Sequence, residues 1–274
     1  MNFKQSLVVL ILTFLLLDIF LAYNVVTSLN QRSFSQSDNI NILEQMKNDN
    51  IVVPVLSVAE ETASFIKTDR LSLLEQIGQL PNQSLTFENN ILHSTLSEPV
   101  QLGTTDITAE SVANLDKFVN ESVFHGDQYS FFTYNPVTRK IVYTQQVGRI
   151  PILDGSSQLV FSLSSSGEVT AYDQTYAGTA EVQGSARTLI TAQKAVELLY
   201  LNNRISSNTT ILKVRLTYSR TLTLTDMYVY GPTWYIELQQ VDGKIEARRV
   251  DAVQGSLLSD DEIETFTRKK QLSE

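Results

Sequence analysis

The chain has 274 residues, of which 42% are hydrophobic and 19% charged, and it has a net charge of −9 at pH 7 and no cysteine. This composition predicts a packed core, while the acidic balance disfavours nucleic acid and anionic headgroups as partners. The missing cysteines exclude disulfides, cysteine-ligated metal centres and thiol catalysis.

The first element in the chain is an apolar run from Leu7 to Val26. As an α-helix it would have the length of a bilayer's hydrocarbon core, so it is predicted to be a transmembrane anchor. An uncleaved anchor is favoured over a cleaved signal peptide for two reasons. The apolar run is long, and the residues at its end, Leu21 to Asn24, do not contain the A-x-A-like pair of small residues that marks a cleavage site. A buried core helix is disfavoured because the run is apolar on all sides and lies at the terminus.

The charges around this anchor predict its orientation. Lys4 and the terminal amine precede it, and Arg32 follows it. By the positive-inside rule, residues 1–6 form a cytoplasmic end and the large C-terminal part is extracytoplasmic. The expected localisation is therefore the cell membrane, with a single pass.

One acid, Asp18, interrupts the apolar run. A carboxylate inside a bilayer is costly and usually faces a partner. Two interpretations remain open: an acid tolerated near the outer headgroups, or a contact with a helix of another membrane protein. In a helix, the residues that share its face form a predicted transmembrane interaction face of Ile11, Phe14, Leu15, Asp18, Leu21, Ala22 and Val25.

The next stretch gives weaker signals. Residues 27–37 are polar and are predicted to be a juxtamembrane spacer. Residues 57–80 are mixed in pattern. The elements predicted up to residue 100 are a helix over Ser37–Lys47, a strand over Ile51–Leu56 interrupted by Pro54, a helix over Ser72–Gln79 and a weak strand over Thr86–Leu96.

A clearer pattern begins at Thr108, which is a suitable cap for a helix that should end at His125-Gly126. Apolar residues recur there every three to four positions, as expected for one buried helix face. Four predicted strands follow: Tyr129–Tyr134, Lys140–Val147, Gln158–Ser164 and Glu168–Tyr176.

The same order of elements then recurs. Thr191 should cap a second helix, with Ala192, Ala195, Val196 and Leu199 on one face. Its four predicted strands are Ile211–Ser219, Leu222–Tyr230, Thr233–Val241 and Lys244–Val250, the last two joined by an Asp242-Gly243 hairpin turn. The residue identities do not repeat, so the similarity is one of pattern.

A helix followed by an antiparallel meander predicts an α+β fold, with each helix packed on one face of a sheet. The expected organisation is a first α+β module with an N-terminal extension over residues 38–180, a second over residues 181–258, and a charged tail over residues 259–274.

The sequence contains few residue patterns that indicate catalysis, metal binding or phosphate binding. His93 and His125 are the only histidines, and they have no metal-binding spacing. No nucleophile elbow and no glycine-rich phosphate loop is present. The acidic run at residues 260–262 could attract a cation but is better explained as a solvated charge run. The chain is therefore predicted not to be an enzyme, with no catalytic residue, cofactor or metal.

Aromatic residues cluster around Gly231-Pro232. Aromatic strand residues are more often core than surface. The alternative is an exposed partner patch formed by Tyr228, Tyr230, Trp234 and Tyr235.

The N-terminal sequence FKQSLVVLILTFLLLDIFLAYN resembles the YycI proteins of Gram-positive bacteria. The residues that carry this resemblance are Thr13, Phe14, Leu15, Leu17, Asp18, Phe20 and Leu21. The later segments TYNPVTRKIVYTQ, ITAQKAVELLY and GPTWYIELQQVDGKIEARRVDAVQG are also similar, and the last follows a PepSY-type pattern.

This resemblance implies an accessory regulator in cell-wall homeostasis. Such a protein acts, together with the membrane protein YycH, on the sensor kinase YycG (WalK) of the YycFG (WalRK) two-component system. The resemblance also implies that transmembrane helices contribute to the kinase contact and that the outer domains of YycI and YycH associate. Two alternatives stay open: an extracytoplasmic binding module for a cell-wall polymer or a peptide, with the helix only a tether, and an undetected hydrolase.

Overall fold

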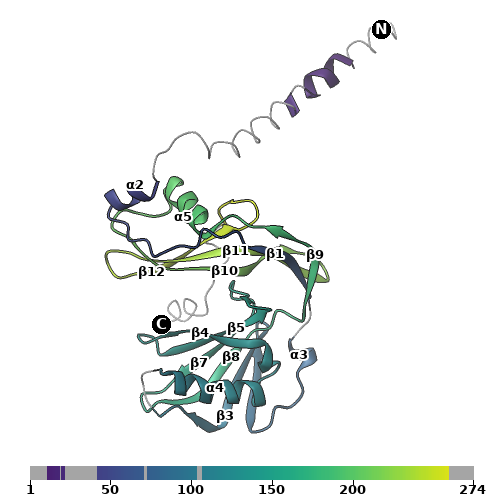
Figure 1. Cartoon of the computed structure of the whole chain (residues 1–274). Helices are drawn as coiled ribbons and strands as arrows, with labels where there is room; N and C mark the ends of the chain where they lie inside the picture. The colour runs from purple at the N-terminus through teal and green to yellow at the C-terminus, as the bar shows by residue number, and fades with distance from the viewer. Residues whose placement is uncertain (1–10, 19, 22–41, 71–72, 104–106, 259–274) are drawn as a thin grey trace. The chain divides into compact units, whose positions relative to one another are not determined.

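The computed structural model describes residues 11–18, 20–21, 42–70, 73–103 and 107–258 (Figure 1). The chain divides into two compact units, Met1–Gln45 and Met46–Glu274. In the first unit, residues 11–18 and 20–21 are helical. No helix within these ranges is both long and apolar enough to span a bilayer.

The second unit contains two antiparallel sheets, which confirms the predicted α+β class (Figure 1). Sheet A has five strands and sheet B has seven. The strands of sheet A are β1 (Thr62–Asp69), β9 (Ala180–Thr188), β10 (Thr210–Thr223), β11 (Met227–Gln239) and β12 (Ile245–Asp251). The strands of sheet B are β2 (Gln83–Glu88), β3 (Ile91–Gln101), β4 (Tyr129–Asn135), β5 (Lys140–Val147), β6 (Ile150–Pro151), β7 (Gln158–Leu163) and β8 (Glu168–Gln174).

Sheet A is organised around β11. The first half of β11 pairs with β1, from Met227 to Tyr230, and the second half pairs with β12, from Thr233 to Gln239. On its other side, β10 pairs along nearly the whole length of β11. Gly231 and Pro232 lie where one neighbour ends and the next begins. Pro232 cannot donate a backbone hydrogen bond, and here its carbonyl accepts from Ala252 N at 3.0 Å.

The two longest helices of the second unit begin at the caps that the sequence predicted, whereas the predicted start at Ser37 lies outside the described residues. The Thr108 hydroxyl accepts from Ser111 N at the start of α4 (Ala109–Ser122), and the Thr191 hydroxyl accepts from Lys194 N at the start of α5 (Ala192–Leu201). Each cap satisfies a backbone donor that has no partner within the helix. The shorter helices are α2 (Ile42–Asn48), α3 (Leu73–Gln76) and the 3₁₀ turn η1 (Gly126–Gln128).

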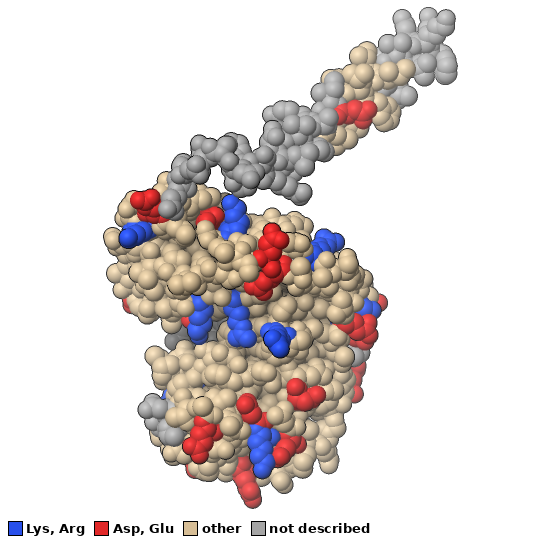
Figure 2. Space-filling view, in the orientation of Figure 1, with Lys and Arg blue, Asp and Glu red and all other residues tan. Residues whose placement is uncertain are grey.

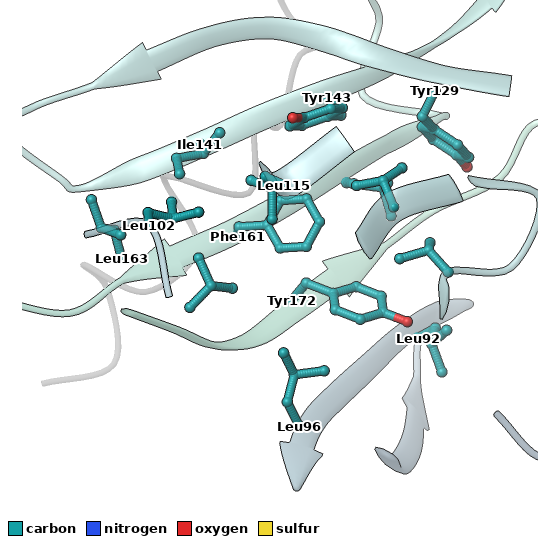
Figure 3. Packing of buried hydrophobic residues seen from close by; sticks show 14 of the residues in the cluster. Leu92, Leu96, Leu102, Leu115, Tyr129, Ile141, Tyr143, Phe161, Leu163 and Tyr172 are labelled. Atoms are coloured by element: carbon teal, nitrogen blue, oxygen red, sulfur yellow. The ribbon is translucent and has the colours of Figure 1, made fainter. Parts of the chain in front are cut away.

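The core of sheet B lies between α4 and the strands. Leu115 and Val119 of α4 pack on Phe161, Tyr172 and other buried side chains, as Figure 3 shows for part of the cluster. Tyr143 OH donates to Asp116 Oδ1 at 2.7 Å and so ties β5 to the helix. Burial raises the pKa of Tyr172 to about 12, which keeps its hydroxyl neutral.

The two sheets are joined by the segment around β6. Ile152 forms a parallel bridge with Tyr218 of β10, and Leu153 N donates to Tyr218 O at 2.9 Å. The Asp154 carboxylate accepts from Arg220 N at 2.7 Å. Apolar contacts among Ile66, Ile152 and Tyr230 accompany these bonds, so the join between the sheets has its own small core.

Several predicted strands require correction. The predicted strands Leu222–Tyr230 and Thr233–Val241 are joined in β11, which runs through Pro232, so the helix α5 is followed by three strands rather than four. The predicted strand Ile51–Leu56 is reduced to one bridge between Val52 and Thr210. The single weak strand over residues 86–96 is a hairpin of β2 and β3, which turns at Asn89 and Asn90 with positive φ.

Two strands of sheet A were not predicted, β1 and β9. Both flank sheet B in the chain, and they pair with each other, with Thr68 opposite Ala180. The expected module boundary at residue 180 therefore does not separate the sheets, because β1 precedes sheet B in sequence and belongs to sheet A.

Gly231 should be intolerant of a side chain. An added Cβ would lie 2.9 Å from Thr221 Cγ2 and 3.0 Å from Phe65 Cε1. We expect Gly231→Val to lower the free energy of unfolding by about 1–3 kcal/mol through overpacking, measured by urea denaturation. Gly78→Ala is the matched control, because no atom lies within 4 Å of that added Cβ. Equal stabilities of the two variants would contradict the packing argument.

Candidate functional site

The predicted aromatic patch is divided between core and surface. Tyr230 is 0% exposed and Trp234 is 3% exposed. The Trp234 indole Nε1 donates to Ile190 O at 2.8 Å, and the Tyr230 hydroxyl lies 3.1 Å from Ser156 Oγ. Both side chains therefore stabilise sheet A and its join to sheet B and are not available on the surface.

The other two members of the patch are partly exposed. Tyr228 lies near two arginines, with the Arg220 guanidinium 4.9 Å and the Arg70 guanidinium 5.7 Å from its ring centre. Tyr235 follows Trp234 directly and so points to the opposite face of the strand. The four side chains do not form one exposed surface. That any of them contacts a partner stays a prediction.

Tyr235 belongs to a row of side chains that crosses sheet A, here called the arginine row. Arg215 of β10 and Arg249 of β12 lie opposite Tyr235 on either side. The Arg249 guanidinium is 5.7 Å from the Tyr235 ring centre, and that ring meets Phe132 of β4 edge to face at 6.2 Å. Burial raises the pKa of Tyr235 to about 12.

The arginine row also links the two sheets. The Arg215 guanidinium lies 5.7 Å from the ring centre of Phe132, which is in sheet B. Arg249 Nη2 donates to Leu153 O at 2.7 Å. Cation–π contacts of this kind contribute about 0.5–2 kcal/mol each, depending on their exposure to water. The row therefore positions positive charge where the sheets meet.

A groove of about 580 Å³ lies along β10 beside this row, and we call it the β10 groove. Its charged lining residues are Arg149, Lys213, Arg215 and Glu61, and its apolar lining includes Leu212, Val214, Leu216, Pro54, Val55 and Leu56. Figure 2 shows several Lys and Arg side chains gathered in the hollow between the two sheets. Sequence reasoning missed this groove, although the alternation of Lys213 and Arg215 on one strand was a usable signal.

The two histidines occupy structural positions. His93 Nδ1 lies 2.7 Å from Asp173 Oδ1 on neighbouring strands of sheet B, and both side chains are partly exposed. His125 follows the end of α4 with φ of 49° and stacks on Tyr176 with ring centres 4.9 Å apart. In the part of the chain that the structure describes, no three His, Asp or Glu side chains gather in a way that could hold a metal ion.

The predicted transmembrane interaction face is described only in part. Ile11, Phe14, Leu15 and Leu21 are each more than half exposed, and Asp18 is exposed between them. Ala22 and Val25 lie outside the described residues. The helical conformation of residues 11–18 places the described members on one side at three- and four-residue spacing.

Comparison with known proteins gives one family. The family model described as YycI protein matches residues 29–253. No curated protein matches. A crystal structure of an uncharacterized protein from Eubacterium rectale ATCC 33656 is similar at 12% identity and a TM-score of 0.47, with 76% of this chain and 89% of that chain covered.

Burial predicts different consequences for the two tyrosines of the aromatic patch. We expect Tyr230→Ala to lower the free energy of unfolding by about 3–5 kcal/mol, because it empties a fully buried site. Tyr228→Ala should cost about 1 kcal/mol or less, since that ring is partly exposed. Trp234, the only tryptophan, reports unfolding of both variants by fluorescence. Similar losses for both would mean that Tyr228 is also a core residue.

Proposed function

The chain belongs to the YycI family, and we propose that it is a membrane-anchored accessory regulator that modulates the sensor kinase of the YycFG (WalRK) system together with YycH. Proteins of this family are regulatory accessories of the YycG/WalK system. The family match over residues 29–253 is the observation that carries the proposal, because it covers most of the chain.

The exposed N-terminal helix supports the membrane anchor. The large apolar side chains of its described residues are between 49% and 65% exposed: Ile11, Leu12, Phe14, Leu15, Leu16, Leu17, Phe20 and Leu21. Exposure of this much apolar surface to water is unfavourable by about 25 cal/mol per Å², whereas a bilayer would cover it. The proposed arrangement is a single pass with residues 1–6 in the cytoplasm and the large C-terminal part outside.

Regulation is proposed to proceed by contact and not by chemistry. The family is one of regulatory accessory proteins, and both histidines lie against structural partners here. His125 stacks on Tyr176, and His93 pairs with Asp173. The apolar segment of residues 7–26 is then the proposed contact with the kinase, and the sheet unit is the proposed contact with YycH.

An anchor exchange tests this proposal. Residues 7–26 are replaced by an unrelated single-pass helix, which keeps the membrane location but removes the specific helix surface. We expect altered transcription of WalR-controlled promoters and loss of co-purification with the kinase, while hydrogen exchange of the two sheets is unchanged. Wild-type promoter output and kinase recovery in the exchanged protein would refute a role for the anchor beyond tethering.

Asp18 provides a finer test of the same helix. We expect Asp18→Leu to improve membrane insertion by about 2–3 kcal/mol, since a carboxylate is removed from the bilayer, and yet to reduce crosslinking to the kinase. Leu17→Ile is the matched control, since it leaves the carboxylate in place. Crosslinking that is equally strong in both variants would identify Asp18 as an acid tolerated near the headgroups.

A further inference from the structure

The outer edge of β10 has a stretch without a paired strand. At one end Val52 forms a parallel bridge with Thr210, and at the other end Ile152 forms a parallel bridge with Tyr218. Between these bridges, β11 is the paired neighbour of β10 among the described strands. The open stretch of about six residues is about 20 Å long, which is enough for one added strand of ordinary length.

Pro54 explains why the chain itself leaves this edge open. Val52 N donates to Thr209 O, and Val52 O accepts from Ile211 N, so a parallel ladder begins at Val52. In such a ladder every second residue donates, and the next donor would be Pro54, which has no N–H. The register of β10 also shifts between Ile211 and Lys213. The ladder therefore stops after one bridge.

The backbone groups on the open edge can be identified from the bond at its end. Tyr218 O accepts from Leu153 N at 2.9 Å, so Tyr218 directs its backbone groups away from β11. Backbone direction alternates along a strand, and no register shift occurs over residues 213–220. Val214 and Leu216 therefore direct their N–H and C=O groups outward as well. Among the described residues, neither takes part in a backbone bond outside the strand ladders.

Three exposed cations line the β10 groove beside this edge: Arg149, Lys213 and Arg215. One carboxylate, Glu61, lines it with them, whereas the net charge of the protein is −9. Lys213 has a distant ion pair, at 4.0 Å from Glu237. Within the described ranges, neither Arg149 nor Arg215 has a carboxylate at ion-pair distance. The groove therefore attracts acidic groups, although the protein as a whole repels them.

The two faces of β10 beside the open edge differ in chemistry. Lys213 and Arg215 lie on one face and Val214 and Leu216 on the other, because side chains alternate along a strand. A strand added to this edge continues both faces of the sheet, so its own side chains alternate in the same way. Acidic side chains beside the cations and apolar side chains beside the valine and leucine match the two faces.

We propose that the β10 groove binds an extended segment of another protein, in which acidic and apolar side chains alternate, and that this segment pairs with β10 as an additional strand. Backbone bonds to Val214 and Leu216 hold the segment, and the cations select its acidic side chains. A second copy of the chain is disfavoured as the occupant, since two-fold pairing of two β10 edges brings Lys213 and Arg215 close to the like-charged residues of the other copy. The proposal rests on the proposed function only for the identity of the partner protein.

Peptide binding to the full-length protein in detergent tests this proposal. The probe is a labelled peptide of about seven residues, in which glutamate and valine alternate, and the control peptide has lysine in place of glutamate. We expect fluorescence anisotropy to detect binding of the glutamate peptide and no binding of the lysine peptide, because the groove is cationic. Equal binding of the two peptides, or a Kd of the glutamate peptide weaker than about 1 mM, would overturn the proposal.

Hydrogen exchange locates the bound peptide. At about ten times its Kd, the peptide should slow exchange of the Val214 and Leu216 amides about tenfold, because these amides donate to it. The amides of Lys213 and Arg215 point toward β11 and are the control on the same strand, so they should change less. Equal slowing of all four amides, or slowing of none, would refute strand addition. Slow exchange without peptide that becomes slower with rising protein concentration would identify a second copy as the occupant instead.

A charge exchange tests the role of the cations. Arg149→Glu should weaken binding of the glutamate peptide about threefold to tenfold and strengthen binding of the lysine peptide. Lys117→Glu on α4 is the matched control, because this exposed lysine does not line the groove, and it should leave both affinities unchanged. Equal affinities of the two variants for the glutamate peptide would overturn the groove as the binding site. None of these measurements involves the kinase, so a negative result here would leave the proposed regulatory function in place.

Discussion

The pairing of β11 is the constraint on which the rest of sheet A depends. One strand of thirteen residues has β10 along one side and two different strands, β1 and β12, along the other. The paired neighbour of β11 changes from β1 to β12 at Gly231-Pro232. Gly231 has no side chain and Pro232 has no N–H, and at this position neither absence disrupts the pairing of β11 with β1 or with β12. Because β1 and β12 come from opposite ends of the folded unit, this one strand holds distant parts of the chain in register.

The charged and aromatic residues at the junction of the sheets follow from the same register. Arg215, Tyr235 and Arg249 are 34 positions apart in the chain at most, yet the pairing of three strands puts them in one row. Tyr230 and Trp234, by contrast, lie on the buried side of β11 and serve packing. A regulator that works by contact needs surfaces whose shape does not depend on a partner, and a row fixed by backbone pairing meets that need.

Sequence reasoning succeeded where the signal was local. The caps at Thr108 and Thr191, the two hairpins of sheet B and the Asp242-Gly243 turn each depend on residues within a few positions, and the structure confirms them. Sequence reasoning failed where a strand depends on its pairing with residues far away in the chain. Pro232 is compatible with a strand only because no ladder needs its N–H, and β9 is mostly exposed, so it shows no core pattern. For the β10 groove, the alternation of Lys213 and Arg215 was the local signal, and the groove as a whole was missed because its lining also comes from distant segments around residues 55 and 149.

The pairing of Thr68 with Ala180 has a consequence for how the protein is assembled. All of sheet B lies between these two residues in the chain, so it is in effect a domain inserted into the β1–β9 hairpin. Its contacts are formed within its own segment, whereas sheet A has to bring residue 66 to residue 230. Bringing distant residues together has an unfavourable entropy of loop closure, which grows with the length of the loop. This cost is smaller once sheet B is folded, because the folded insert shortens the effective loop. During synthesis, sheet B can therefore act as the local unit whose folding brings the two ends of sheet A together.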